Sequence, residues 1–122
     1  MDNKPRTVDN LINSTLASLG VPVERLRFTG EADTYITFQL LNGQEAEHAD
    51  DEEIAYEHYY RGDIFSKGNY LTLLQQMKKA LKAAGFYGIT VNAEMYENDT
   101  ALYHVSLDFY YMEVCNHENR TT

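Results

Sequence analysis

The segment at residues 45–53 brings together more side chains suited to chemistry than any other part of the sequence. It reads EAEHADDEE, and histidines stand at positions 48 and 58. Carboxylates and imidazoles at this density could bind a divalent metal, imitate the phosphates of a nucleic acid, or form a charged loop that contacts a partner. The six carboxylates of this acidic segment are Glu45, Glu47, Asp50, Asp51, Glu52 and Glu53.

The spacing within the acidic segment disfavours a metal site. Its candidate ligands would be Glu47, His48, Asp50 and Asp51. A calcium loop needs ligands at regular alternate positions and a glycine at its bend, and EAEHADDEE has neither feature. A two-metal nuclease would hold its acids on rigid strand ends, whereas these acids crowd a connection. We therefore expect no metal and no cofactor.

The remaining reactive side chains do not form a catalytic pattern. His58 and His104 could meet across a sheet, but a histidine among tyrosines is more typical of hydrogen-bonded packing. The single cysteine, Cys115, follows the last predicted strand, and no serine stands in a glycine-flanked elbow. The sequence therefore predicts no catalytic residue, no enzyme and no intramolecular disulfide, and it suggests a reducing compartment.

Composition bounds the size of the protein and the class of its partners. A chain of 122 residues suits a single domain. Ten tyrosines suit half-buried strands and interfaces, where a ring is covered while its hydroxyl stays in water. The net charge of -9 opposes nonspecific binding to nucleic acid or an anionic membrane, and without the acidic segment it would be -3. No apolar run has the length of a signal peptide or a membrane span, so we expect a soluble chain.

Two stretches have the apolar spacing of a helix. From residue 7 to 19, apolar residues recur at helical intervals, Thr7 can cap the start, and Gly20 and Pro22 end the run. The stretch 66–86 has a second apolar stripe with lysines outside it. Ser66 or Asn69 can cap this second helix, and Gly85 can end it in a left-handed conformation.

Apolar and polar residues alternate, as is typical of strands, in four stretches at residues 34–41, 54–65, 87–96 and 101–111. A short additional strand is possible at 25–28. The order predicts an α+β fold in which two helices pack on one face of a largely antiparallel sheet of about four to five strands. The acidic segment would be a long loop between two of the strands. Residues 1–114 would form one domain, and residues 115–122 a frayed tail.

Two stretches carry a resemblance to a known family. They are GDIFSKGNYLTLLQQMKKALKAAGF, from Gly62 to Phe86, and MYENDTALYHVSLDFYYME, from Met95 to Glu113. They resemble the tail-terminator or tail-completion proteins, also described as head-to-tail joining proteins, of long-tailed phages and prophages of Gram-positive bacteria. The likeness covers residues 34–113 well and the first helix more loosely.

The resemblance implies a structural protein of the virion, placed at the joint of tail and head and assembled in the host cytoplasm. Such a subunit forms a ring, commonly a hexamer, that caps the head-proximal end of the tail tube and stops polymerisation of the major tail protein. The ring presents a surface to the neck connector, and DNA passes through its bore without specific binding. The acidic segment would then face the bore, where it would repel DNA, or dock on the tail tube protein.

Two other functions fit the same sequence. The protein could be another head-tail connector or neck component, which has a similar size and fate. It could also be an acidic inhibitor that imitates DNA, although its carboxylates are concentrated in one segment rather than spread over an extended surface.

Overall fold

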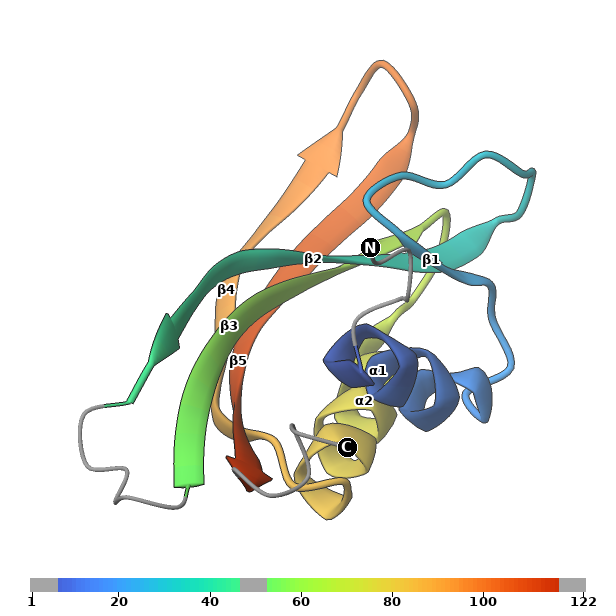
Figure 1. Cartoon of the computed structure of the whole chain (residues 1–122). Coiled ribbons are helices and arrows are strands. Elements are labelled where there is room, and N and C mark those ends of the chain that lie inside the picture. Colours follow the sequence, from blue (N-terminus) through green and yellow to red (C-terminus); the bar gives the residue numbers. More distant parts are fainter. Residues whose placement is uncertain (1–6, 47–52, 117–122) are drawn as a thin grey trace.

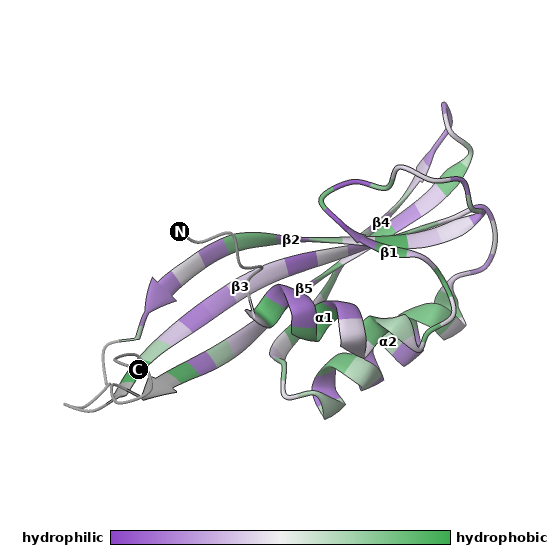
Figure 2. Ribbon diagram, turned by 45° about the vertical axis from the view of Figure 1, so that its right-hand side comes forward, coloured by the Kyte–Doolittle hydropathy of each residue, from purple (hydrophilic) through white to green (hydrophobic). Residues whose placement is uncertain are grey.

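The computed structural model describes residues 7–46 and 53–116, which form two helices and a five-stranded sheet (Figure 1). Both helices lie on the same side of the sheet, as Figures 1 and 2 show from two directions. The predicted α+β fold is confirmed. The elements are α1 (Thr7–Ala17), β1 (Val23–Arg25), β2 (Thr34–Glu45), β3 (Glu53–Ser66), α2 (Leu71–Ala83), β4 (Tyr87–Glu97) and β5 (Leu102–Asn116).

The strands lie in the order β1-β2-β3-β5-β4, so β3 and β5 are the central pair. The short strand β1 runs parallel to β2, and every other neighbouring pair is antiparallel. The β3–β5 pairing continues without a register shift from Glu53 opposite Asn116 to Ser66 opposite Tyr103. In contrast, the outer pairs β2–β3 and β4–β5 both contain bulges.

Several strand boundaries differ from those expected. Glu45 closes β2 opposite Tyr56, and Glu53 opens β3, so the expectation that both belong to the acidic loop is wrong. The physical reason is that the backbone hydrogen bonds of the pair continue past the end of the apolar pattern. β5 likewise runs to Asn116, beyond the expected strand end, and the short first strand lies at 23–25 rather than 25–28.

The core lies between the helices and the covered face of the sheet. Alternate residues of β2, β3 and β5 turn toward the helices, and Tyr60, Phe109 and Ile36 are fully buried there. On the last strand, Val105, Leu107 and Phe109 face the helices and are buried. Tyr103 has the same parity but is 42% exposed, because it stands at the far end of the strand beside the turn. The other buried core residues include Val8, Ile12, Leu16, Phe38, Ile64, Leu74, Met77, Leu81 and Phe86.

Helix α2 ends as the sequence suggests, but its start differs. It begins at Leu71 with Tyr70 at the N-cap and without a capping hydrogen bond from the N-cap side chain, so the expectation that Ser66 or Asn69 caps it is wrong. Asn69 stands one position before the N-cap, and its side-chain oxygen accepts a hydrogen bond from the backbone N–H of Leu71 at 2.9 Å. At the other end Gly85 has a φ of 101°, and the N–H of Phe86 bonds to the carbonyl of Leu81 at 3.0 Å. This pattern is a Schellman motif, which satisfies the last carbonyls and turns the chain into β4.

Glycine at position 62 allows α2 to pack closely on the sheet. Gly62 lies on the covered face of β3, opposite Leu107. A Cβ atom built there would stand 2.7 Å from the Met77 terminal methyl group and 3.3 Å from a ring carbon of Phe109. Both neighbours are fully buried, so neither has free space to move into.

We predict that Gly62→Ala lowers the free energy of unfolding by about 1–3 kcal/mol, because an added methyl group overpacks this contact. Urea unfolding followed by circular dichroism measures the change. Gly68→Ala is the matched control, since nothing lies within 4 Å of a Cβ atom at that position. Equal stability of the two variants would contradict the close approach.

Candidate protein-interaction surface

The helices cover one face of the sheet (Figure 2). The opposite face carries a dense set of polar and aromatic side-chain contacts. We call this surface the open face. Every second residue of β3 lies on the open face, and so does the β5 residue directly paired with it, because directly paired residues share a face. Its residues are Tyr35, Glu57, Tyr59, Arg61, Asp63, Phe65, Asn92, His104, Ser106, Asp108 and Tyr110.

Asp108 is the centre of the open face. The Arg61 guanidinium donates two hydrogen bonds to its carboxylate, from Nε at 2.7 Å and from Nη2 at 3.2 Å. Tyr59 donates a third from its hydroxyl at 2.6 Å, and the Asn92 amide donates a fourth at 3.1 Å. These donors, with Arg61 the strongest, hold the pKa of Asp108 below its usual value although burial acts in the opposite direction.

One row of stacked rings borders this polar centre on the side of β2. Phe28 stacks on Tyr35 with ring centroids 4.3 Å apart, and Tyr35 stacks on Phe65 at 5.0 Å. Phe65 stacks in turn on the His104 imidazole at 4.3 Å. The row therefore links the loop after β1 to strands β2, β3 and β5.

A second row of rings borders the polar centre on the side of β4. Tyr59 stacks on Tyr110 at 4.7 Å, and Tyr110 on Tyr87 at 6.0 Å. The Tyr87 hydroxyl donates a hydrogen bond to Glu57. Burial and that hydrogen bond raise the pKa of Tyr87 to about 12. The ring of Tyr87 is nevertheless 40% exposed, so it offers an aromatic surface to a partner.

The two strand histidines lie on opposite faces of the sheet, so they do not meet. His104 Nε2 lies 2.8 Å from Asp63 on the open face, and His58 Nε2 lies 2.9 Å from Glu113 on the covered face. Both Nδ1 atoms are buried away from solvent. These contacts support the interpretation of both residues as hydrogen-bonded packing residues.

The open face combines features of a protein-binding surface. Its Tyr and Arg side chains are of the types enriched in interfaces, and they are fixed by hydrogen bonds and stacking before any partner arrives. Binding then costs little side-chain entropy. The high tyrosine content indicated interfaces in general, but it did not predict this surface. The alternate positions of the predicted strands carried the signal that could have found it.

The expected site residues of the acidic segment are only partly described. Glu45 is an exposed residue at the end of β2, and Glu53 is the first residue of β3. Glu47, His48, Asp50, Asp51 and Glu52 lie outside the described residues. Within residues 7–46 and 53–116, no group of three His, Cys, Asp or Glu side chains could hold a metal ion. None of the helices in these ranges is long and apolar enough to cross a membrane.

Several solved structures are similar to this chain. One of them is a chain in a structure described as the virion of a native gene transfer agent particle, with 15% sequence identity and a TM-score of 0.48. The match covers 81% of the present chain and 88% of that chain. No family model and no curated protein matches the sequence. Values this low do not establish a shared function.

We predict that Asp108→Asn lowers the free energy of unfolding by about 2 kcal/mol at pH 7, because the amide cannot accept hydrogen bonds as a carboxylate does. The pKa of Asp108 is lowered in the folded protein, so its stabilisation is present above the ordinary aspartate value of 3.8 and is lost as the pH falls through the lowered pKa. The difference between variant and parent should therefore shrink below about pH 4.

Urea unfolding at pH 7, 5, 4 and 3 tests this dependence on Asp108. Asp33→Asn is the control, because the Asp33 side chain is 85% exposed and lies 3.8 Å from the Lys67 amine. That substitution should change stability by less than about 0.5 kcal/mol at each pH. A constant difference between Asp108→Asn and the parent from pH 7 to 3 would contradict the assignment.

Proposed function

We propose that the chain is a structural protein of a phage or phage-like virion and has no enzymatic activity. Its copies assemble as a ring on the head-proximal end of the tail tube. The ring stops polymerisation of the major tail protein and forms the joint to the neck connector, and DNA passes through the bore in transit. The observation that carries this proposal is the open face, a pre-ordered aromatic and polar surface on a sheet whose helices lie on its other side.

The open face is better suited to contact with the end of a tail tube than to catalysis of a reaction. Its central carboxylate, Asp108, already accepts four hydrogen bonds from three side chains, so it has little capacity left to bind a substrate or to transfer a proton. The exposed groups around it, including Tyr87 and Met95, present carbon surface. We assign this surface to the tail tube protein.

The residues behind the family resemblance contribute to this surface. Asp63 and His104 belong to the resembling stretches, and they bond to each other on the open face. Tyr96 and Tyr103 belong to them as well, but they stand at covered-face positions of β4 and β5, where their ring centroids lie 4.9 Å apart. The residues of the resembling stretches therefore make contacts that order the sheet rather than a reaction centre.

A ring also needs two different surfaces that meet head to tail between copies. The sheet supplies two unlike edges. β1 forms one edge and has only three residues, whereas the bulged strand β4 forms the other. A contact between unlike regions can close into a ring of any number of subunits.

We expect tail tubes assembled from the major tail protein to have a defined length when the present protein is added and an unlimited length without it. Negative-stain electron microscopy of the two reactions measures the tube lengths and shows whether the protein sits at one end. Tubes of equal and unlimited length in both reactions would rule out the tail-terminator function. Protein found only after heads attach would favour the alternative neck component.

The substitution Met95→Glu should weaken capping by at least tenfold in the protein concentration required. Met95 is 49% exposed and pairs with His104, so the new charge would lie on the open face. Val91→Glu is the matched control, because Val91 is 39% exposed on the same strand but pairs with Leu107 on the covered side. Equal capping by the two variants would place the tube contact elsewhere.

A further inference from the structure

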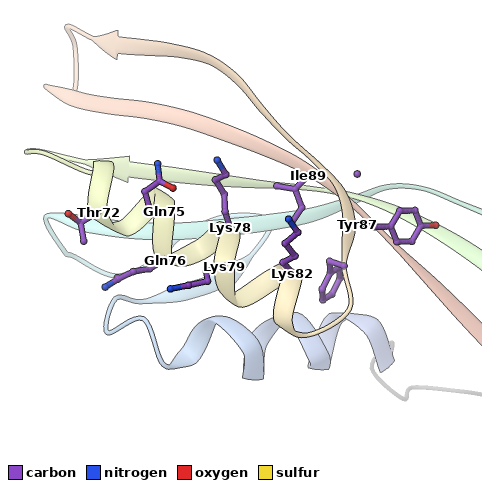
Figure 3. Close-up of a pocket in the computed structure, with 10 residues that line it drawn as sticks. Thr72, Gln75, Gln76, Lys78, Lys79, Lys82, Tyr87 and Ile89 are labelled. Atoms are coloured by element: carbon purple, nitrogen blue, oxygen red, sulfur yellow. The ribbon is translucent and has the colours of Figure 1, made fainter.

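A groove runs between α2 and the start of β4 (Figure 3). Its volume is about 650 Å³, which is the size of a site for a short peptide or a small ligand. The buried Phe86 ring and the half-buried Ile89 form an apolar floor. Lys78, Lys79 and Lys82 of α2 line the groove, and we call it the lysine groove.

The charge of the lysine groove is opposite to that of the protein. Three of the ten basic residues of the chain line it, and it has no carboxylate among its lining residues. None of these lysines forms an ion pair within the described parts of the chain. Elsewhere, Arg61 is paired with Asp108, and Lys67 lies beside Asp33. The groove thus presents three uncompensated positive charges on a chain of net charge -9.

We propose that the lysine groove binds the acidic segment, residues 45–53, of a second copy of this chain. The proposal rests on the proposed ring and names the contact between its subunits. The segment supplies six carboxylates in nine positions, and the groove supplies the matching cations. Ala46 and Ala49 interrupt the acids, and their methyl groups suit the apolar floor.

A peptide segment fits the groove better than a nucleic acid does. A nucleic acid would meet three lysines on a surface whose remaining charge repels it at long range. The groove also adjoins an outer edge of the sheet, because β4 pairs with β5 on one side and has no strand beside it on the other within the described residues. An extended segment could therefore add backbone hydrogen bonds to Tyr87, Gly88 or Ile89.

The ends of the segment lie away from the groove of the same copy along the sheet, which favours a groove of a second copy as its binding site. The Ala46 N–H bonds to the Ala55 carbonyl at 2.6 Å, so the segment starts and ends at one place in the sheet, and half of its length would span about 14 Å if fully extended. Ala55 pairs with Val114, whereas Tyr87 at the groove pairs with Tyr110 on the far side of β5. Four residues along a strand span roughly 14 Å, so the ends of the segment lie about that far along the sheet from Tyr87.

A peptide-binding measurement tests the groove itself. The receptor is the full chain with its six segment acids changed to amides (Glu45→Gln, Glu47→Gln, Asp50→Asn, Asp51→Asn, Glu52→Gln, Glu53→Gln), which leaves the groove free. A fluorescent peptide of sequence EAEHADDEE should bind it saturably, and the affinity should fall as salt rises. Adding Lys78→Glu, Lys79→Glu and Lys82→Glu should weaken binding at least tenfold, whereas Lys67→Glu should change it less than twofold.

A charge-exchange experiment tests the contact between copies. One variant carries the three groove substitutions, and a second carries Glu47→Lys, Asp50→Lys, Asp51→Lys and Glu52→Lys. Each variant alone should sediment as a monomer at concentrations where the parent associates, and an equal mixture should associate again because each segment then meets a groove of opposite charge. Circular dichroism and urea midpoints confirm that both variants are folded.

Several results would overturn the proposal. One is peptide binding that the groove substitutions leave unchanged, and another is a mixture that does not associate. Tighter binding of a single-stranded oligonucleotide than of the peptide, lost in the same groove variant, would assign the groove to nucleic acid. A parent that stays monomeric, and whose groove opens to peptide only after its own acids are removed, would show binding within one copy. Groove variants that still associate and still cap tubes would overturn this contact while leaving the proposed function intact.

Discussion

The pairing of β3 with β5 is the constraint on which both the covered face and the open face of the sheet depend. It runs through fourteen residue pairs without a register shift. Because side chains alternate between faces, a slip of one residue would carry Leu107 and Phe109 to the open face and place Asp108 beneath the helices. The apolar face stabilises one register through burial, and the Arg61–Asp108 hydrogen bonds stabilise the same register from the other side. The core and the interaction surface are therefore two consequences of one alignment.

The covered face contains one polar contact that fixes the first helix. The Tyr60 hydroxyl donates a hydrogen bond to Asp9 of α1, and both side chains are buried. Apolar packing alone would allow α1 to slide along the sheet, whereas a buried hydrogen bond has a defined geometry and is costly to break. Gly62 acts similarly for α2, because the missing side chain lets Met77 approach the backbone of β3. Each helix thus has one specific point of attachment.

Patterns among neighbouring residues predicted most of the helices and strands. The features that were not predicted depend on contacts between residues far apart in the sequence. The helix end at Gly85, the alternation of β2 and β5, and the turn after Glu97 follow from neighbours in the chain. The bulges in β2 and β4 and the continuation of β2 to Glu45 depend on the partner strand. The open face was missed for the same reason, since Tyr59, Arg61 and Asn92 converge on Asp108 only after three strands have been aligned.

The far ends of β2 and β3 extend past the core of the subunit. Residues 41–45 of β2 are all exposed, so the backbone ladder with β3 holds them and apolar burial contributes little. Val114, on the neighbouring stretch of β5, is also 57% exposed. A ladder that extends past its core has few contacts to offset the entropy of ordering its residues. Such an extension gains stability when a second protein surface covers it, as a neighbouring subunit would in the ring that we propose.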